Sequence, residues 1–533
     1  MPLRKTRESK EEKLNQVKRT SKDRKNTSRN VSKTGSDENK HFRPKSATRH
    51  DGEEKRHFGT TSTIRTDGQN RKGREQIHAR TGGEQVELQI TGLGSGGEGV
   101  GRYNNLAVFV PGALPGETVK ASLDMVKKTF ARGRLLRVLK ASADRVEPVC
   151  SVYKECGGCQ LQHLSYSAEL KAKQQQVRDA LTRIGHLPEM IVLPVIGAVD
   201  PWHYRNKMQV PVAQAKNGVA IGCFAQFTHK VINVKACAIQ KEANNDIAEI
   251  VRSWMHQYKI TAYDEDRRTG IVRHIMGRVG VQTGELMVCL VTAVEQVPHS
   301  KELVKLLQDG LPGLTSVVQN INTRHTNVIL GPQTRLLFGR STIKDSIGPL
   351  QFNISAQSFF QVNSDQAQRL YEQALEFAAL TGKETVADVY CGTGTITLFL
   401  ARKAKFVYGI EIVPSAIKDA HKNAALNKIS NVDFILGDAA YELPALIKGG
   451  VHPDVIVLDP PRAGCEEKVL AAMTQVKPKR IVYVSCNPAT LARDLAYLTA
   501  HGFKAVKAQP VDMFSRTHHV ETVALLERVD KKK

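Results

Sequence analysis

Five short apolar runs alternate with stretches of helical periodicity over the last third of the chain. They read VADVY, VYGIEI, VDFILGD, DVIVLDPP and RIVYVSCNP. Apolar strands separated by helices are typical of a parallel sheet with helices on both faces. The pattern therefore predicts an α/β fold, with a doubly wound, Rossmann-like domain over residues 351–533.

The first run leads into a glycine turn, YCGTGT. Gly392 and Gly394 allow a tight turn and a close approach of a ligand to the backbone. A dinucleotide-binding turn would carry a third glycine where this chain has Thr397, so a mononucleotide-like ligand fits better. Glu411 ends the second run, where a carboxylate can bind ribose hydroxyls, and Asp438 ends the third, near the expected place of an adenine.

Two reactive side chains end the fourth and fifth runs, at the same predicted sheet edge. These are Asp459 and Cys486. Most cysteines are buried spectators, but a thiol at a strand end beside a ligand crevice is placed to attack a substrate. His518, His519 and Glu521 are candidate bases, and we favour Glu521 because it opens another apolar stretch. Helix capping by Asp459 and a surface role for Glu521 are the alternatives.

Six motifs occur together in a fixed order: SFFQVN, YCGTGT, GIEIVPSAI, DPPRAG, VSCNP and HVETVALL. With them the chain resembles the bacterial RNA uracil-5-methyltransferase family, from about residue 84 to residue 528. The resemblance implies S-adenosylmethionine as the cofactor, Cys486 as the nucleophile and Glu521 as the base. The implied cofactor-binding residues are Gln361, Tyr390, Glu411 and Asp459.

The implied reaction needs both a thiol and a base. Uracil C5 is too weak a nucleophile to take a methyl group from a sulfonium unaided. Addition of a thiolate to C6 gives an enolate with charge at C5, which attacks the methyl group. A base must then remove the C5 proton so that the cysteine can leave.

Residues 84–142 contain the short runs VELQI, LAVFV, TVKASL and RLLRVL, separated by GLGSGGEGVGR and PGALPGE. Short strands with glycine and proline turns predict a small, closed, OB-like β-barrel. The stretch resembles the TRAM domain, an RNA-binding barrel. A barrel without a ligand is the alternative.

Three cysteines are spaced C-x5-C-x2-C, and a fourth follows at a distance: Cys150, Cys156, Cys159 and Cys237. Four thiolates could hold zinc or an iron–sulfur cluster. Zinc ribbons usually pair two C-x2-C knuckles, and Cys237 has no such partner. The resemblance to ribosomal members of the family implies a [4Fe-4S] cluster. We expect it to be structural, because methyl transfer needs no electron; zinc and unligated thiols are the alternatives.

The net charge of +24 is unevenly distributed, and residues 1–80 hold 23 Lys and Arg against 11 Asp and Glu. Residues 1–83 lack any apolar period, which predicts a disordered basic arm. Glu11 and Glu53 argue against a transit peptide. Such a basic excess favours a nucleic-acid partner.

Residues 143–350 show mixed strand and helix signals, which predict an α+β central domain that carries the cysteines and binds RNA. Within the family, a barrel combined with a cysteine cluster points to structured RNA of the 23S ribosomal type, with transfer RNA as the alternative. A flipped uridine needs contacts to flanking RNA. Candidates for these contacts are Arg205, Lys207, Arg273, His274 and Arg278.

No apolar run reaches the roughly 18 residues of a membrane span, and nine cysteines in a large chain fit a reducing compartment. We therefore expect a cytoplasmic monomer with no membrane partner. Two rival enzymes fit less well. Radical methylthiotransferases need C-x3-C-x2-C, and cytosine-5-methyltransferases typically have a Pro-Cys nucleophile, whereas this chain has Ser-Cys-Asn-Pro. A ribosome-assembly protein with an inactive methyltransferase fold is the non-enzyme alternative.

Overall fold

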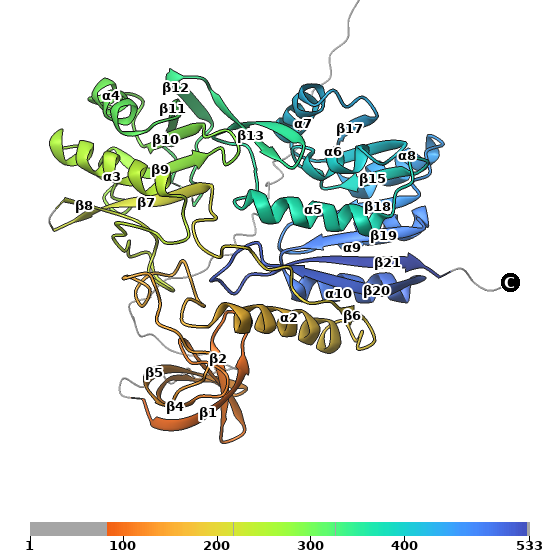
Figure 1. The fold of residues 1–533 in the computed structure, drawn as a ribbon, viewed down its shortest axis with the longest axis horizontal. Helices are drawn as coiled ribbons and strands as arrows, with labels where there is room; N and C mark the ends of the chain where they lie inside the picture. Colours follow the sequence, from red (N-terminus) through yellow and green to blue (C-terminus); the bar gives the residue numbers. More distant parts are fainter. Residues whose placement is uncertain (1–82, 217, 326, 530–533) are drawn as a thin grey trace, which may run out of the picture. The chain divides into compact units, whose positions relative to one another are not determined.

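The computed structural model describes residues 83–529, except 217 and 326 (Figure 1). The expected basic arm therefore lies outside the described residues, apart from Gly83. The described strands form a closed barrel, a six-stranded sheet, a two-stranded hairpin and an eight-stranded sheet. Among these residues, no helix has both the length and the apolar character needed to cross a membrane.

The closed barrel has the strand order β1-β2-β3-β5-β4, which confirms the predicted barrel. In β1, buried and exposed residues alternate because one face of the strand packs into the barrel core. The sequence did not predict β2, which lies in the glycine-rich segment. A Cβ on its Gly99 would come within 2.7–2.8 Å of Ala113, so glycine is needed for this close packing. The strands are β1 (Gln85–Leu93), β2 (Gly99–Tyr103), β3 (Leu106–Val110), β4 (Thr118–Val126) and β5 (Phe130–Lys140).

The six-stranded sheet has the order β12-β11-β10-β9-β7-β8. Helices α3 (Glu242–Gln257) and α4 (Ser300–Gly310) pack on it through a core that contains Trp254 and Leu303. The strands are β7 (Lys207–Ala215), β8 (Gly218–Ile221), β9 (Val272–Val279), β10 (Leu286–Thr292), β11 (Leu314–Ile321) and β12 (Gln333–Gly339). The hairpin of β13 (Thr342–Ile347) and β14 (Leu350–Ser355) follows.

The eight-stranded sheet has the order β17-β16-β15-β18-β19-β21-β20-β6. Its first five strands are parallel, and β21 runs antiparallel between β19 and β20. The strands are β15 (Thr385–Val389), β16 (Phe406–Glu411), β17 (Val432–Leu436), β18 (Val455–Leu458), β19 (Arg480–Ser485), β20 (Phe503–Val511) and β21 (Glu521–Arg528).

Two separate apolar cores cover the two faces of this sheet, which confirms the doubly wound prediction. Figure 1 shows α5 beside the middle strands of the sheet and α2 beside β20 and β6. One core holds α5 (Ser364–Ala378), α6 (Thr395–Ala401) and α7 (Pro414–Leu426). The other holds α2 (Tyr166–Arg183), α8 (Ala439–Lys448), α9 (Glu467–Val476) and α10 (Pro488–Ala500).

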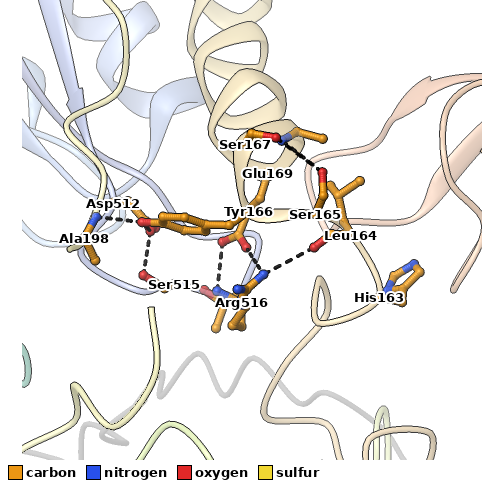
Figure 2. A network of polar contacts seen from close by, with 12 residues as sticks. His163, Leu164, Ser165, Tyr166, Ser167, Glu169, Ala198, Asp512, Ser515 and Arg516 are labelled. Carbon is orange, nitrogen blue, oxygen red and sulfur yellow. Dashed lines mark hydrogen bonds and ion pairs between the residues drawn. The ribbon is translucent and has the colours of Figure 1, made fainter. Parts of the chain in front are cut away.

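Helix α2 and strand β6 (Ile191–Val192) join this sheet from a distant part of the chain, with β6 parallel to β20. A buried polar network fixes α2 to the segment before β21. The Lys173 ammonium forms ion pairs with Glu169 and Asp512. Glu169 accepts a hydrogen bond from the Arg516 N–H at 2.8 Å, and the Tyr166 hydroxyl donates to Asp512 at 2.6 Å (Figure 2). The network therefore positions the residues that lead into Glu521.

Candidate active site

Four candidate side chains lie at one edge of the large sheet. Tyr390 follows β15, Glu411 ends β16, Asp459 follows β18 and Cys486 follows β19. These strands are parallel and pair as neighbours in the order β16-β15-β18-β19. Their carboxyl ends therefore meet, as ligand sites of open α/β sheets require.

The glycine turn and Glu411 form a rigid unit. The Glu411 carboxylate accepts hydrogen bonds from the N–H of Gly392 at 3.1 Å and of Val413 at 2.9 Å. Each carboxylate oxygen keeps a free lone pair for a ribose hydroxyl. Tyr390 has a φ of +65°, a strained conformation for a non-glycine residue that recurs at functional sites. The turn thus has the form of a nucleoside cradle.

Apolar and acidic groups lie beside this cradle. Ile412 and Leu436 are exposed, which leaves an apolar surface against which a flat ring could pack. Asp438 caps α8 by accepting from the Ala440 N–H at 2.9 Å, and it forms an ion pair with Lys468 at 2.9 Å. The structure therefore already engages the Asp438 carboxylate, and the Lys468 contact lowers its pKa.

Thr397 occupies the position of the third dinucleotide glycine, and the structure gives it another role. Its hydroxyl donates to Asp388, a fully buried carboxyl on β15. Burial raises the pKa of Asp388 to about 7. The other Asp388 oxygen has no hydrogen-bond partner among the described residues. A buried acid therefore lies directly beneath the glycine turn.

Cys486 and Glu521 face each other across two antiparallel strands. Ser485 of β19 pairs with Thr522 of β21, so the next positions toward the sheet edge are Cys486 and Glu521. Residues directly opposite each other in such a ladder project to the same face. Glu521 is only 5% exposed, whereas Cys486 is partly accessible.

The electrostatics of the pair favour the protonated form of both groups. Burial and the nearby Asp459 carboxylate raise the pKa of Glu521 to about 8. Burial, together with Glu521 and Asp459, raises the pKa of the Cys486 thiol to about 11. Burial also raises the pKa of Asp459 to about 7. Such clustered, shifted groups in a crevice are typical of catalytic sites.

Sequence reasoning missed Arg462, which belongs to the same cluster. Its guanidinium acts against these shifts, because it lowers the pKa of both Cys486 and Glu521. Its carbonyl accepts hydrogen bonds from Asn487 at 3.1 Å and Thr490 at 3.3 Å, which ties it to the start of α10. The available signal was its place in DPPRAG, three residues after Asp459.

The two histidines are held away from the role of base. His518 Nδ1 lies 3.1 Å from Gln160 Oε1, and the ring centroids of His518 and His519 are 4.0 Å apart. Burial lowers the pKa of His519 to about 3. Of the three candidate bases, Glu521 is the one that the strand register places opposite Cys486.

Gln361 lies in the loop before α5, where Asn206, the residue before β7, holds it. The Asn206 side chain donates to the Gln361 carbonyl at 3.0 Å, and the Asn206 N–H donates to the Val362 carbonyl at 2.8 Å. Gln361 is itself buried. The central region therefore fixes a loop that the sequence assigned to the cofactor.

Two of the expected RNA-contacting residues were predicted wrongly. Arg273 is buried and forms an ion pair with Glu265. Arg278 is buried and donates to the carbonyls of Ala356 and Ser358. Both arginines are therefore directed into the protein, although the Arg278 Nε has no hydrogen-bond partner among the described residues. Arg205, Lys207 and His274 are partly exposed and stay predictions.

The four predicted cluster cysteines line one cavity of about 210 Å³, together with Cys223, which the sequence reasoning missed. Burial and the adjacent thiols raise the pKa of Cys159 to about 12. So many neighbouring thiols can ionise together only around a cationic centre, so the donor set suits a thiophilic metal group. Among the described residues, no three His, Cys, Asp or Glu side chains form a ready-made site for a single ion.

Comparisons with known proteins agree with this geometry. The sequence model of tRNA (uracil-5-)-methyltransferases matches residues 165–529, and that of the TRAM domain matches residues 79–136. A Halalkalibacterium halodurans protein named an uncharacterized RNA methyltransferase is 50% identical over 442 residues, 83% of this chain and 96% of the relative. A Clostridium tetani protein of the same description is 48% identical over 447 residues, 84% of this chain and 97% of the relative.

Among solved structures, a similar one is the Pyrococcus abyssi tRNA (uracil-54, C5)-methyltransferase in complex with S-adenosyl-L-homocysteine. It is 26% identical, with a TM-score of 0.66, and the match covers 83% of this chain and all of that one.

Proposed function

The chain belongs to the tRNA (uracil-5-)-methyltransferase family, whose members are S-adenosylmethionine-dependent RNA methyltransferases, and we propose that it methylates C5 of a uridine. We propose 23S ribosomal RNA as the substrate on separate grounds, given below. Cys486 is the proposed nucleophile and Glu521 the proposed base. The observation that carries the proposal is the Ser485–Thr522 pairing, because it brings a thiol and a buried carboxyl together beside the nucleoside cradle.

S-adenosylmethionine supplies the methyl group when it is bound. Glu411 would accept hydrogen bonds from the ribose hydroxyls of the cofactor. Gln361 and Tyr390 would line the path between the cofactor and the substrate. Asp459, on the strand between the cradle and Cys486, would orient the uracil. Apolar Ile412 beside Glu411 offers a surface for the adenine.

Cys486 acts first in this mechanism. Its thiolate adds to uracil C6, and Arg462 favours the charged form. After methyl transfer to C5, Glu521 accepts the C5 proton, the C5–C6 double bond re-forms and the Cys486–C6 bond breaks. The raised pKa of Glu521 makes its carboxylate a stronger base than an exposed glutamate.

An RNA that contains 5-fluorouridine tests this chemistry, because fluorine at C5 cannot leave as a proton and the adduct persists. We expect a covalent complex that survives denaturation with the native chain and with Cys465→Ala, a matched thiol control. Cys486→Ala should form none. An equal adduct with Cys486→Ala would disprove the mechanism.

The ribosomal substrate is supported by the presence of both the barrel and the thiol cavity in one chain, because the resemblance to the family links that combination to 23S ribosomal RNA. The Pyrococcus abyssi neighbour acts on a transfer RNA, and this favours transfer RNA as the second candidate. Mapping 5-methyluridine in both RNA classes from a deletion strain separates the two. Loss from 23S RNA alone supports the proposal, whereas loss from transfer RNA alone contradicts it.

We further propose that Cys150, Cys156, Cys159 and Cys237 hold a [4Fe-4S] cluster. Their shared cavity supports a thiophilic, cationic group there, because four thiolates need more positive charge than the one arginine that lines it, Arg205. Anaerobically purified protein should contain about four iron and four sulfide per chain. Zinc without iron would contradict this assignment.

A further inference from the structure

Two adjoining cavities, of about 860 and 500 Å³, separate the barrel from the cysteine-bearing segment. Both are lined by Gln160 and by Phe227 of the loop at residues 222–232. The larger one is also lined by Arg132 and Arg137 of β5 and by Lys154. We call the two cavities together the barrel hollow. The function proposed above assigns no role to it.

The barrel hollow contains an aromatic ring that the fold does not use. Phe227 is 75% exposed and has a φ of +60°. Its tight loop is closed by hydrogen bonds from the Ala225 N–H to the Lys230 carbonyl at 2.8 Å and from the Thr228 N–H to the Ala225 carbonyl at 3.1 Å. An apolar ring held in strained backbone and open to water contributes little to folding, which points to a function.

One cation lies over this ring, and others line the same hollow. The guanidinium of Arg132 lies 5.5 Å from the Phe227 ring centroid. The segment Lys120–Lys140 carries seven Lys and Arg and one acid, Asp124, which pairs with Arg134. Arg132, Arg137 and Lys154 form no ion pair with any described residue, so their charges are free for phosphates.

Three acidic residues also line the hollow: Glu98, Asp124 and Glu147. The Asp124 charge is already balanced by its ion pair with Arg134. The unpaired arginines and lysine therefore outnumber the unpaired carboxylates.

The barrel hollow reaches the segment that precedes the candidate base. Its smaller cavity is lined by His518, three residues before Glu521. The glycine loop of the barrel packs directly against this region, because a Cβ on Gly97 would lie 3.2 Å from Gln160 and 3.4 Å from His518. A polymer bound along β5 would therefore extend toward His518, in the segment that precedes Glu521.

We propose that an unpaired stretch of the RNA substrate occupies the barrel hollow, with one base stacked on Phe227 and the adjoining phosphates bound by Arg132, Arg137 and Lys154. An exposed aromatic ring beside free cations is the combination that binds single-stranded nucleic acid. This inference rests on the proposed function, since it assigns the hollow to the same RNA.

Binding of a short fluorescein-labelled oligouridylate to the full-length protein tests the proposal. Phe227→Ala should weaken binding by about 5- to 100-fold, as expected for the loss of one base–aromatic stack. Phe227→Trp keeps an aromatic ring and should bind like the native chain. Arg132→Gln should lower the slope of log affinity against log salt by about 0.7, as for one single-strand phosphate. Arg402→Gln is the charge control, an exposed arginine at the end of α6 that does not line the hollow.

A spectroscopic signal separates stacking from a change in folding. Oligouridylate should quench the added tryptophan of Phe227→Trp and leave that of Ile184→Trp, an exposed position at the end of α2, unchanged. Unchanged affinity in Phe227→Ala, or equal quenching at both positions, would overturn the proposal. The proposal would also be overturned if polyglutamate displaced the oligouridylate and Phe227→Ala did not change its binding. That result would indicate a surface that binds acidic proteins.

The 5-fluorouridine adduct depends on Cys486 and reports on the proposed function separately. If Phe227 variants change oligouridylate binding but the native chain forms no adduct, RNA binding in the barrel hollow is supported and the proposed function is contradicted. If the adduct forms but Phe227 variants bind oligouridylate like the native chain, only the proposal that RNA binds in the barrel hollow is contradicted.

Discussion

Cys486 and Glu521 lie opposite each other at the edge of the large sheet, one position beyond the Ser485–Thr522 pair. One strand of this pair runs parallel to the cofactor-side strands and the other runs antiparallel. The antiparallel direction of β21 is what brings the start of one strand to the end of the other. The same register therefore sets both halves of the proposed reaction, the attack and the proton removal.

Replacement of the base should stop the reaction after methyl transfer. Without a proton acceptor, Glu521→Gln cannot release Cys486 from the methylated ring, so an adduct should accumulate with ordinary uridine RNA. Denaturing gels and mass measurement of the adduct check this, with Glu521→Asp as the control that keeps a carboxylate. Normal turnover by Glu521→Gln would assign the base elsewhere.

Arg462 should set how readily the thiol ionises. Its loss removes a cation that lowers the pKa of Cys486, and each pKa unit reduces the thiolate fraction about tenfold. We expect Arg462→Ala to form the 5-fluorouridine adduct about tenfold more slowly and Arg462→Lys to recover part of the rate. The rate of adduct formation is measured by quenching samples at set times. Equal rates for the native chain, Arg462→Ala and Arg462→Lys would show that Arg462 does not promote ionisation of the thiol.

The rate of methylation should rise with pH. The pKa of Glu521 is raised to about 8, so below that pH the carboxyl is mostly protonated and cannot accept the C5 proton. Cys486 must also lose a proton, which acts in the same direction. A single-turnover profile should therefore increase through pH 8, and a profile that is flat or falls between pH 6 and 9 would contradict these assignments.

The buried ion pairs of α2 should stabilise the fold. Lys173→Met leaves the Asp512 carboxylate buried without its cation and Glu169 with only the Arg516 guanidinium, at a cost of about 3–5 kcal/mol. Lys171→Met, at an exposed position of the same helix, is the matched control. Denaturant unfolding should separate the two variants, and equal free energies of unfolding would show that the network adds nothing.

Cys223 lines the thiol cavity but stands outside the predicted ligand set. Cys223→Ala should therefore keep iron and sulfide, whereas Cys237→Ala should lose them. Metal and sulfide analysis of the purified variants checks this. Iron loss in Cys223→Ala with full retention in Cys237→Ala would reassign the fourth ligand.

Much of the site could be predicted because it depends on strand ends. Apolar runs bounded by glycine and proline identify buried parallel strands, and Asp459 and Cys486 follow from their carboxyl ends. The pairing of β6 with β20 joins residues more than 300 positions apart, and no local pattern encodes it. For the same reason, no local pattern indicates that Cys223 would join the thiol cavity.

Charge alone also misled the sequence analysis. Arg273 and Arg278 have the same composition signal as RNA-binding arginines, but internal carbonyls and Glu265 use their donors. Only the three-dimensional partners distinguish a buried arginine from a free one. Phe227 shows the reverse case, because an isolated phenylalanine suggests a core residue until its exposure is known.

The central claim is that Cys486 forms the covalent bond to the uracil ring, and mass spectrometry of the digested 5-fluorouridine complex tests it most directly. We expect a methylated fluorouridine nucleotide on the peptide that contains Cys486, and on no other cysteine peptide. A nucleotide on another residue, or a stable complex with no modified cysteine, would contradict it.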